Sequence, residues 1–174
     1  MSSISYDLTK IKAFVFDVDG VLSHEVSPLY PNGEPMRTVS TKDGYAIHEA
    51  VKKGFQVGII TTGHTEAVHT RFSNLGAQHI YLHSRRKMDD FEDFISKTGL
   101  KDEEIIYVGD DLPDYEIMKR VGLPVAPADA VPEIKAIAKY ISSRKGGESV
   151  ARDVIEQTLR AQGLWMSDET AFIW

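Results

Sequence analysis

The chain has 174 residues, of which 42% are hydrophobic, so it can bury one core and we expect a single domain over residues 1–174. Its net charge is −6 and its isoelectric point is about 5.5, which leaves no basic stripe of the kind that DNA or RNA binding needs. No stretch approaches the ~18 apolar residues of a membrane span, and the N-terminus lacks the pattern of a signal peptide. The absence of cysteine excludes disulfides and thiolate metal sites. We therefore predict a soluble, cytoplasmic protein with neither a nucleic-acid nor a membrane partner.

Short apolar runs alternate with helical patterns along the chain. The apolar runs predict strands at Ala13–Phe16, Gln56–Ile60, His79–Leu82, Ile105–Val108, Pro124–Ala126 and Tyr140–Ser142. The helical patterns predict helices at Asp43–Lys53, Thr65–Leu75, Lys87–Thr98, Pro113–Val121, Val131–Ala138 and Glu148–Gln162. Short strands with few polar positions are typical of a parallel sheet that is covered on both faces. The alternation predicts the α/β class, with a doubly wound, Rossmann-like parallel sheet.

Two segments depart from this alternation. Residues 23–40, "SHEVSPLYPNGEPMRTVS", contain three prolines and the turn signal "PNGEP", and we interpret them as a projecting β-hairpin. The other spacers are too short for a second domain, so we expect no cap domain. The tail at residues 163–174, "GLWMSDETAFIW", carries apolar side chains that are costly to leave in water, among them Trp165, Met166, Phe172, Ile173 and Trp174. We predict that this tail docks on a neighbouring subunit or on the protein's own surface.

Polar side chains follow the predicted strands at the points where ligands bind in parallel sheets. The first strand is followed by two aspartates, the second by two threonines, the third by a lysine and the fourth by "GDDLPD". These residues are Asp17, Asp19, Thr61, Thr62, Lys87, Asp110, Asp111 and Asp114. The carboxyl ends of the strands therefore bring carboxylates, hydroxyls and an ammonium to one edge of the sheet.

The carboxylates at this edge require cations. Asp17 and Asp19 are two residues apart in an extended segment and point to the same face, and Asp110 adds a third carboxylate. At ~4 Å and an effective dielectric of ~20, each pair repels by about 4 kcal/mol. Hard oxygen ligands without His or Cys select Mg²⁺, which readily shares a phosphate, and Lys87 supplies a further positive charge. The sequence predicts a site for magnesium and a phosphate.

These residues also resemble a known family. "DVDG", the threonine that ends "GIITT", Lys87 and "GDDLPD" look like the four motifs of the haloacid-dehalogenase-like phosphohydrolases, in the family's order. "DVDGVL", the hairpin, "TKDG", "YVGDD" and "KGGESVARDVIE" are similar to a capless subfamily, the 3-deoxy-D-manno-octulosonate 8-phosphate phosphatases. That resemblance implies a homotetramer in which the hairpins pack together and a neighbouring subunit closes each active site. It also implies a phosphorylated sugar acid as substrate, on the route to lipopolysaccharide precursors.

The resemblance implies roles for the residues at the strand ends. Asp17 would attack phosphorus and form an aspartyl-phosphate, and Asp19 would protonate the leaving group and then activate water. Mg²⁺ would be held by the carboxylate of Asp17, the backbone carbonyl of Asp19 and the carboxylate of Asp110. Thr61 and Lys87 would stabilise the transferring phosphoryl group.

The remaining implied roles concern orientation and substrate binding. Asp111 and Asp114 would orient Lys87 and metal-bound waters. Thr62 and Arg71 are candidates for substrate binding, the latter across a subunit boundary. The chain departs from the subfamily at "ITTGH", where Thr62 replaces a glycine and Gly63 replaces a longer polar residue.

Other functions compete with this interpretation. A sister group that acts on a nine-carbon keto-deoxy acid phosphate carries a glutamate at the position of Gly63, and its absence favours the eight-carbon acid. A phospho-receiver signalling domain also uses a carboxylate cluster, a lysine and Mg²⁺, but its phosphorylated aspartate ends strand three, where this chain has no carboxylate. An inactive scaffold and a phosphomutase are further alternatives. The intact motif residues disfavour the scaffold, and the lack of room for a cap disfavours the mutase.

Overall fold

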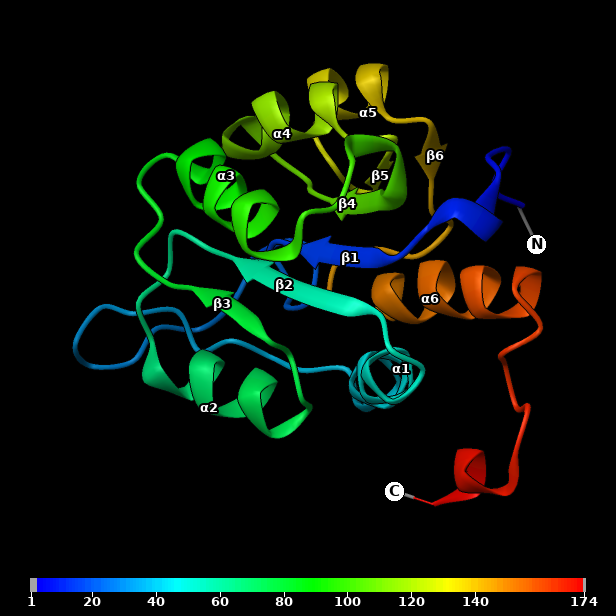
Figure 1. Cartoon of the computed structure of the whole chain (residues 1–174). Helices are drawn as coiled ribbons and strands as arrows, with labels where there is room; N and C mark the ends of the chain where they lie inside the picture. The colour runs from blue at the N-terminus through cyan, green and yellow to red at the C-terminus, as the bar shows by residue number, and fades with distance from the viewer. Residues whose placement is uncertain (1–2, 174) are drawn as a thin grey trace.

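The structure is a computed structural model that describes residues 3–173, and its centre is a six-stranded sheet (Figure 1). All neighbouring strands are parallel, in the order β3-β2-β1-β4-β5-β6. The strands are β1 (Ala13–Phe16), β2 (Gln56–Ile60), β3 (His79–Tyr81), β4 (Ile105–Val108), β5 (Leu123–Ala126) and β6 (Tyr140–Ile141). This order confirms the predicted doubly wound sheet. The predicted strand bounds differ from the observed ones by at most one residue, within the usual uncertainty of element ends.

Helices cover both faces of the sheet. They are α1 (Thr41–Lys52), α2 (Glu66–Asn74), α3 (Lys87–Thr98), α4 (Tyr115–Arg120), α5 (Pro132–Ile137) and α6 (Val150–Ala161). Helices α1, α2 and α6 lie on one face, and α3, α4 and α5 lie on the other (Figure 1). Short 3₁₀ turns occupy Leu8–Lys10, Asp102–Glu104, Leu112–Asp114 and Glu169–Phe172.

The central strand β1 shows why these residues form a covered sheet. All four of its side chains are buried. Phe14 and Phe16 point into the core beside α1 and α6, whereas Ala13 and Val15 point into the core beside α3 and α4. A strand that alternates between two apolar cores has no solvent face, so its run of apolar residues is continuous and the first polar side chain, Asp17, marks its end.

The segment at residues 23–40 projects on the side to which the arrowheads of β1 and β2 point (Figure 1). Its two legs are joined by a turn in which Tyr30 N donates to Glu34 O at 2.8 Å. The only β-type backbone pairing between the legs is an isolated antiparallel bridge between Leu29 and Pro35, and the strands that the hairpin prediction implied are not formed. Prolines have no N–H to donate, so the three prolines of this segment prevent a longer ladder. We refer to residues 23–40 as the projecting loop.

The C-terminal tail folds back on the chain's own surface in part. Trp165 packs against the core beside α1 and α6, with its ring edge-on to Tyr45 and under the guanidinium of Arg152. This contact confirms docking on the protein's own surface for Trp165. Phe172 remains 73% exposed and Ile173 65% exposed. Trp174, which the prediction included, lies outside the described residues.

Among residues 3–173, no helix combines the length and apolar character needed to cross a bilayer.

Candidate active site

Asp17 leaves β1 into a tight turn that carries the first motif. Its backbone N donates to Val108 O at 3.1 Å, which continues the pairing of β1 with β4 by one residue. One carboxylate oxygen, Oδ1, accepts from Val18 N at 2.6 Å. Gly20 follows with a φ of +78°, a left-handed conformation that favours glycine. The strand and the turn together hold the Asp17 side chain at the carboxyl edge of the sheet.

Lys87 joins two carboxylates beneath this turn. It is the first residue of α3, and its Nζ lies 2.6 Å from Asp17 Oδ2 and 2.7 Å from Asp114 Oδ1. All three side chains are buried or nearly so, with Lys87 2% and Asp114 0% exposed. Burial alone would lower the pKa of Lys87, but the charges of Asp17 and Asp114 hold this pKa above its ordinary value. Lys87 is therefore a fixed ammonium beside Asp17.

Asp114 anchors this arrangement from below. Its Oδ1 also accepts from the hydroxyl of Tyr107 at 2.6 Å, and its Oδ2 accepts from Asp110 N at 3.0 Å. Asp114 thereby binds Lys87, as the sequence interpretation expects. Asp111 contributes differently: it is exposed, and its carboxylate accepts from Leu112 N to cap the short 3₁₀ turn.

Three carboxylates form the part of the site that suits a metal ion. Asp17, Asp110 and Asp114 each offer one oxygen, and these oxygens lie within 4.8 Å of one another. Asp110 Oδ1 is buried and has no hydrogen-bond partner among the described residues. A buried acceptor that faces other carboxylates is costly unless a cation binds it. The donor set is all oxygen, so these residues fit Mg²⁺.

The pKa values of the carboxyl groups in this cluster also indicate a cation site. Burial and the charge of Asp114 raise the pKa of the Asp17 carboxyl well above its ordinary value, against the lowering effect of Lys87. Burial and Asp114 also raise the pKa of Asp110 to about 7. One ammonium therefore does not neutralise the cluster, and a bound divalent cation would restore the ionised forms.

The Asp19 side chain points elsewhere. Its two oxygens accept from the guanidinium of Arg37, Oδ1 from Nε and Oδ2 from Nη2, each at 2.8 Å. The Asp19 carboxylate is therefore outside the cluster of Asp17, Asp110 and Asp114. The expected metal contact of Asp19 is its backbone carbonyl, and this contact stays a prediction.

The structure separates the two threonines that follow β2. Thr61 is buried, and its hydroxyl accepts from Gly63 N at 3.1 Å. Thr62 is exposed. Arg71, on α2, packs against Gly44 of α1, where an added Cβ would overlap its guanidinium. Within the described residues of this single chain, Arg71 makes no hydrogen bond or ion pair with the catalytic carboxylates.

The segment at residues 143–149 supports the catalytic turn of its own chain. Gly147 N donates to Val21 O at 2.8 Å, and a Cβ at Gly146 would overlap Gly20 O. The two glycines of "KGG" therefore allow a close backbone approach within the subunit. The expected closure of each active site by a neighbouring subunit stays a prediction.

Sequence reasoning missed Arg37. It lies in the projecting loop, 18 positions after Asp19, in a stretch without strand or helix periodicity. No local motif marks it, because its role depends on how the projecting loop folds back over the catalytic turn.

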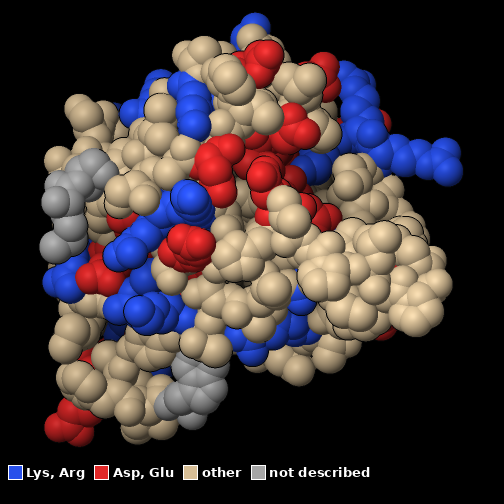
Figure 2. All heavy atoms as spheres, turned by 180° about the vertical axis from the view of Figure 1, so that it is seen from behind, with Lys and Arg blue, Asp and Glu red and all other residues tan. Residues whose placement is uncertain are grey.

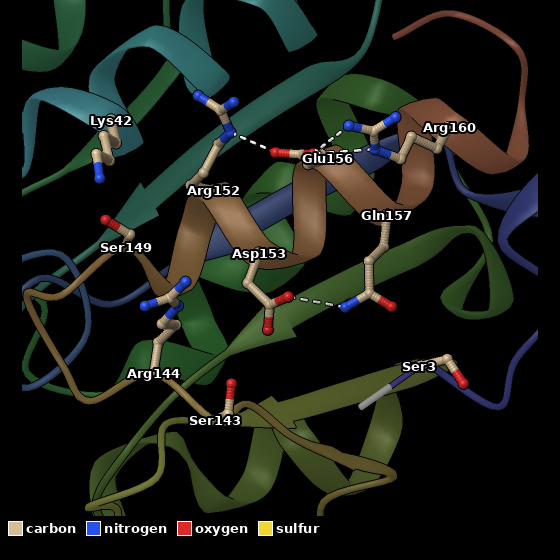
Figure 3. A pocket seen from close by; sticks show the side chains of 10 residues that line it. All are labelled: Ser3, Lys42, Ser143, Arg144, Ser149, Arg152, Asp153, Glu156, Gln157 and Arg160. Atoms are coloured by element: carbon tan, nitrogen blue, oxygen red, sulfur yellow. Dashed lines mark hydrogen bonds and ion pairs between the residues drawn. The ribbon is translucent and has the colours of Figure 1, made fainter. Parts of the chain in front are cut away.

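The acidic side chains are not evenly spread over the surface. Figure 2 shows them gathered near the middle of the face seen from behind, beside a largely uncharged projection. Elsewhere, a cavity of about 540 Å³ lies on the outer side of α6 (Figure 3). Some of its charged groups pair with one another, as Glu156 does with Arg152 and Arg160, each at 2.6 Å. We place the chemistry at the carboxylate cluster, because this cavity lacks a comparable set of buried, unneutralised groups.

Comparison with known proteins agrees with this geometry. The profile of the haloacid dehalogenase-like hydrolases matches residues 72–153. The 3-deoxy-D-manno-octulosonate 8-phosphate phosphatase of Escherichia coli strain K12 is 38% identical over 153 residues, which cover 88% of this chain and 81% of that protein. The chain is thus a hydrolase of the haloacid dehalogenase-like class. Its buried lysine lies among carboxylates at the carboxyl edge of a doubly wound sheet.

Solved structures narrow the assignment. The Yersinia pestis 3-deoxy-D-manno-octulosonate 8-phosphate phosphatase matches with a TM-score of 0.86 and 32% identity, over 91% of this chain and 85% of that one. The Moraxella catarrhalis enzyme, solved in complex with a magnesium ion, a phosphate ion and a KDO molecule, matches with a TM-score of 0.85 and 28% identity, over 90% of each chain. The chain belongs to the haloacid dehalogenase-like hydrolases, in the family that contains these phosphatases.

Proposed function

We propose that the chain is a Mg²⁺-dependent phosphatase that hydrolyses 3-deoxy-D-manno-octulosonate 8-phosphate to the free sugar acid and inorganic phosphate, in lipopolysaccharide precursor biosynthesis. The observation that carries the proposal is Lys87, buried between Asp17 and Asp114 beside the unpaired oxygen of Asp110. This arrangement presents a nucleophile and positive charge to a phosphoryl group.

In the first step, a carboxylate oxygen of Asp17 forms a bond to phosphorus while the bond from phosphorus to the sugar oxygen breaks. Asp19 gives its proton to that oxygen, so the sugar acid leaves as a neutral alcohol at this position. Lys87 offsets the negative charge on the phosphoryl oxygens from its position 2.6 Å from Asp17 Oδ2.

Asp17, Asp110 and the Asp19 carbonyl would hold the magnesium ion. When bound, the ion supplies charge neutralisation for the carboxylates and the phosphoryl oxygens. The unpaired Asp110 Oδ1 supports its part in this ligand set.

In the second step, water attacks the phosphorus of the aspartyl-phosphate. Asp19 takes a proton from this water, the bond between Asp17 and phosphorus breaks, and inorganic phosphate leaves. Asp17 and Asp19 return to their starting forms, so the cycle balances with one water consumed. Asp114 keeps Lys87 oriented through both steps by its 2.7 Å contact.

A homotetramer and a cytoplasmic location belong to the same proposal. The projecting loop carries exposed apolar side chains, among them Val26, Leu29 and Val39, and such a patch is typical of a surface that packs against another subunit. Sedimentation of the purified protein tests the assembly, and a monomer at micromolar concentration would contradict it. The cytoplasmic location expected from the sequence stays a prediction.

The function is tested by measuring phosphate release with Mg²⁺ across phosphorylated sugars and keto acids. We expect a marked preference for the eight-carbon sugar acid phosphate and loss of turnover with a chelator, reversed by added Mg²⁺. A preference for the nine-carbon acid phosphate would change the proposed substrate but not the proposed mechanism. A long-lived phosphoprotein without multiple turnovers would instead favour a phospho-receiver.

A further inference from the structure

Arg37 and Asp19 form a two-point ion pair between the projecting loop and the catalytic turn. Arg37 Nε and Nη2 each donate to a different oxygen of Asp19, both at 2.8 Å. The Arg37 side chain is 10% exposed and that of Asp19 is 37% exposed. A guanidinium matches a carboxylate in this parallel geometry, so both the position and the orientation of each group are fixed.

The surroundings hold Arg37 in place. Its third nitrogen, Nη1, donates to Thr65 Oγ1 at 2.7 Å, and this hydroxyl donates onward to Glu34 Oε2 at 2.9 Å. Every nitrogen of the guanidinium is therefore engaged. The hydrogen-bonded chain ties the projecting loop to the start of α2.

Gly63 supplies the space for the guanidinium. An added Cβ at this position would overlap Arg37 Nη2 and approach Cζ at 2.8 Å. Gly63 is buried, so the side chain of any other residue would be forced into the position that Arg37 occupies. The glycine that departs from the subfamily pattern is thus the residue that admits Arg37.

The pair conflicts with the role proposed for Asp19. To give a proton to the sugar oxygen, Asp19 must carry that proton on one carboxyl oxygen and donate it from there. In the substrate-free chain both oxygens already accept from Arg37. The ion pair must therefore open before the reaction, and a group on the substrate has to take the place of one partner.

The space beside Arg37 suits an anionic group. A cavity of about 80 Å³ lies between the projecting loop and α2, and its lining includes Arg37, Thr65 and Arg71. Arg71 makes no ion pair with an acidic side chain within the described residues. A liquid water molecule takes about 30 Å³, so the cavity has room for a carboxylate but not for a whole sugar. Most of the lining is apolar, and its charged part consists of the guanidinium groups of Arg37 and Arg71, which favour a negative charge on that side of the cavity.

We propose that Arg37 exchanges partners. It binds Asp19 in the substrate-free enzyme and binds the carboxylate of the sugar acid in the complex. Asp19 is then released, takes up a proton from solvent and passes this proton to the sugar oxygen. This proposal rests on the function proposed above. Recognition of the substrate carboxylate is then coupled to catalysis, so a phosphate ester without a carboxylate leaves Asp19 engaged and is hydrolysed slowly even when it binds.

The test compares Arg37→Met on two substrates, the sugar acid phosphate and a polyol phosphate that lacks a carboxylate. For the acid, we expect kcat/KM to fall about 10- to 100-fold, the effect of losing one charge-assisted bidentate contact. For the polyol phosphate, we expect kcat to rise, because Asp19 is no longer held by Arg37. An equal loss on both substrates, or no loss on either, overturns the exchange.

Two further variants keep the result interpretable. Gly63→Ala leaves Arg37 in the chain but displaces its guanidinium, and we expect the same substrate-dependent pattern. Arg160→Met removes an arginine that also pairs with a carboxylate, that of Glu156 at 2.6 Å. The Arg160 side chain lies on the outer side of α6 and is 58% exposed. We expect this control to leave both substrates unaffected. Unfolding midpoints show whether each variant is folded.

Binding gives a readout apart from turnover. Titration calorimetry with the free sugar acid is expected to show about tenfold weaker binding to Arg37→Met than to the unmodified chain. Unchanged affinity contradicts the proposed carboxylate contact. If the unmodified chain releases no phosphate from the sugar acid phosphate, the proposed function fails. If it does release phosphate but the variants do not discriminate between the substrates, only the partner exchange fails.

Discussion

Lys87 and Arg37, two ion-paired cations at the catalytic edge, differ in the structural elements that hold them in place. Lys87 contacts Asp17 at 2.6 Å and Asp114 at 2.7 Å in a buried setting built on β1, α3 and the turn after β4. Arg37 contacts Asp19 at 2.8 Å from the projecting loop, which pairs only through an isolated bridge. The contacts of Lys87 are part of the framework built on the sheet, whereas the contact of Arg37 depends on a loop with few backbone hydrogen bonds. The nucleophile and its ammonium are thus held by the rigid elements of the fold, whereas the contact that we propose to exchange is made by the projecting loop.

The largest expected effect on activity comes from removing the nucleophile, Asp17, which Lys87 contacts. Asp17→Asn keeps the shape of the side chain but not its nucleophilic oxygen, so we expect phosphate release to fall about 10⁴-fold or more. The measurement is steady-state phosphate release with Mg²⁺, with circular dichroism to confirm folding. Retained turnover would refute Asp17 as the nucleophile.

Removing a lysine ammonium is expected to have different effects on stability at the buried Lys87 and at the exposed Lys97. Lys87→Met leaves buried carboxylates without their cation, and we expect a loss of about 3–5 kcal/mol in the free energy of unfolding without metal. Lys97→Met is the matched control, because Lys97 pairs with Asp93 at 2.6 Å but is 56% exposed. We expect it to cost less than about 1 kcal/mol. Urea unfolding measures both, and similar losses would show that burial does not decide the strength of these pairs.

The catalytic turn and the turn of the projecting loop can be compared directly. Gly20 has a φ of +78° and Gly33 a φ of +86°, so alanine strains the backbone at both. At Gly20, however, a Cβ would overlap the Asp110 carboxylate, whereas at Gly33 it would meet no atom of residues 3–173 within 4 Å. We expect Gly20→Ala to weaken Mg²⁺ binding about tenfold or more and Gly33→Ala to leave it unchanged. Calorimetric titration with Mg²⁺ distinguishes them, and equal affinities would remove Asp110 from the metal site.

The smallest effect concerns a buried carboxylate outside the site. Asp43 Oδ1 accepts from Arg152 N at 2.6 Å, while its Oδ2 is buried without a partner among the described residues. Burial raises the pKa of Asp43 to about 6 from an ordinary value of 3.8. Its ionisation therefore opposes folding, and stability is lost as the pH rises from about 4 through about 6.

Asp43→Asn removes this dependence. We expect the stability of the variant relative to the unmodified chain to increase by about 1 kcal/mol between pH 5 and pH 8. Urea unfolding at the two pH values measures the difference, with the exposed Asp89→Asn as control. A difference that does not change with pH would show that Asp43 ionises as readily in the folded chain as in the unfolded one.

The framework of the site was predictable from local patterns. The apolar runs of β1, β2 and β4 end in polar residues, and parallel strands place those ends at one edge. Asp17, Lys87 and Asp110 could therefore be grouped without a structure. The projecting loop was recognised as a turn, but its pairing was overestimated, because prolines keep a chain extended without supplying ladder donors.

What the sequence determined by itself is the order of elements and the residues at their ends, since hydrophobic periodicity and strand termini are local properties. Only the tertiary structure decided the position of Arg37 over Asp19, the space that Gly63 leaves for it and the support of Gly20 by Gly146. These contacts join segments far apart in the chain at distances where one added carbon causes overlap. No local pattern encodes such a fit, because it exists only when the segments have packed together.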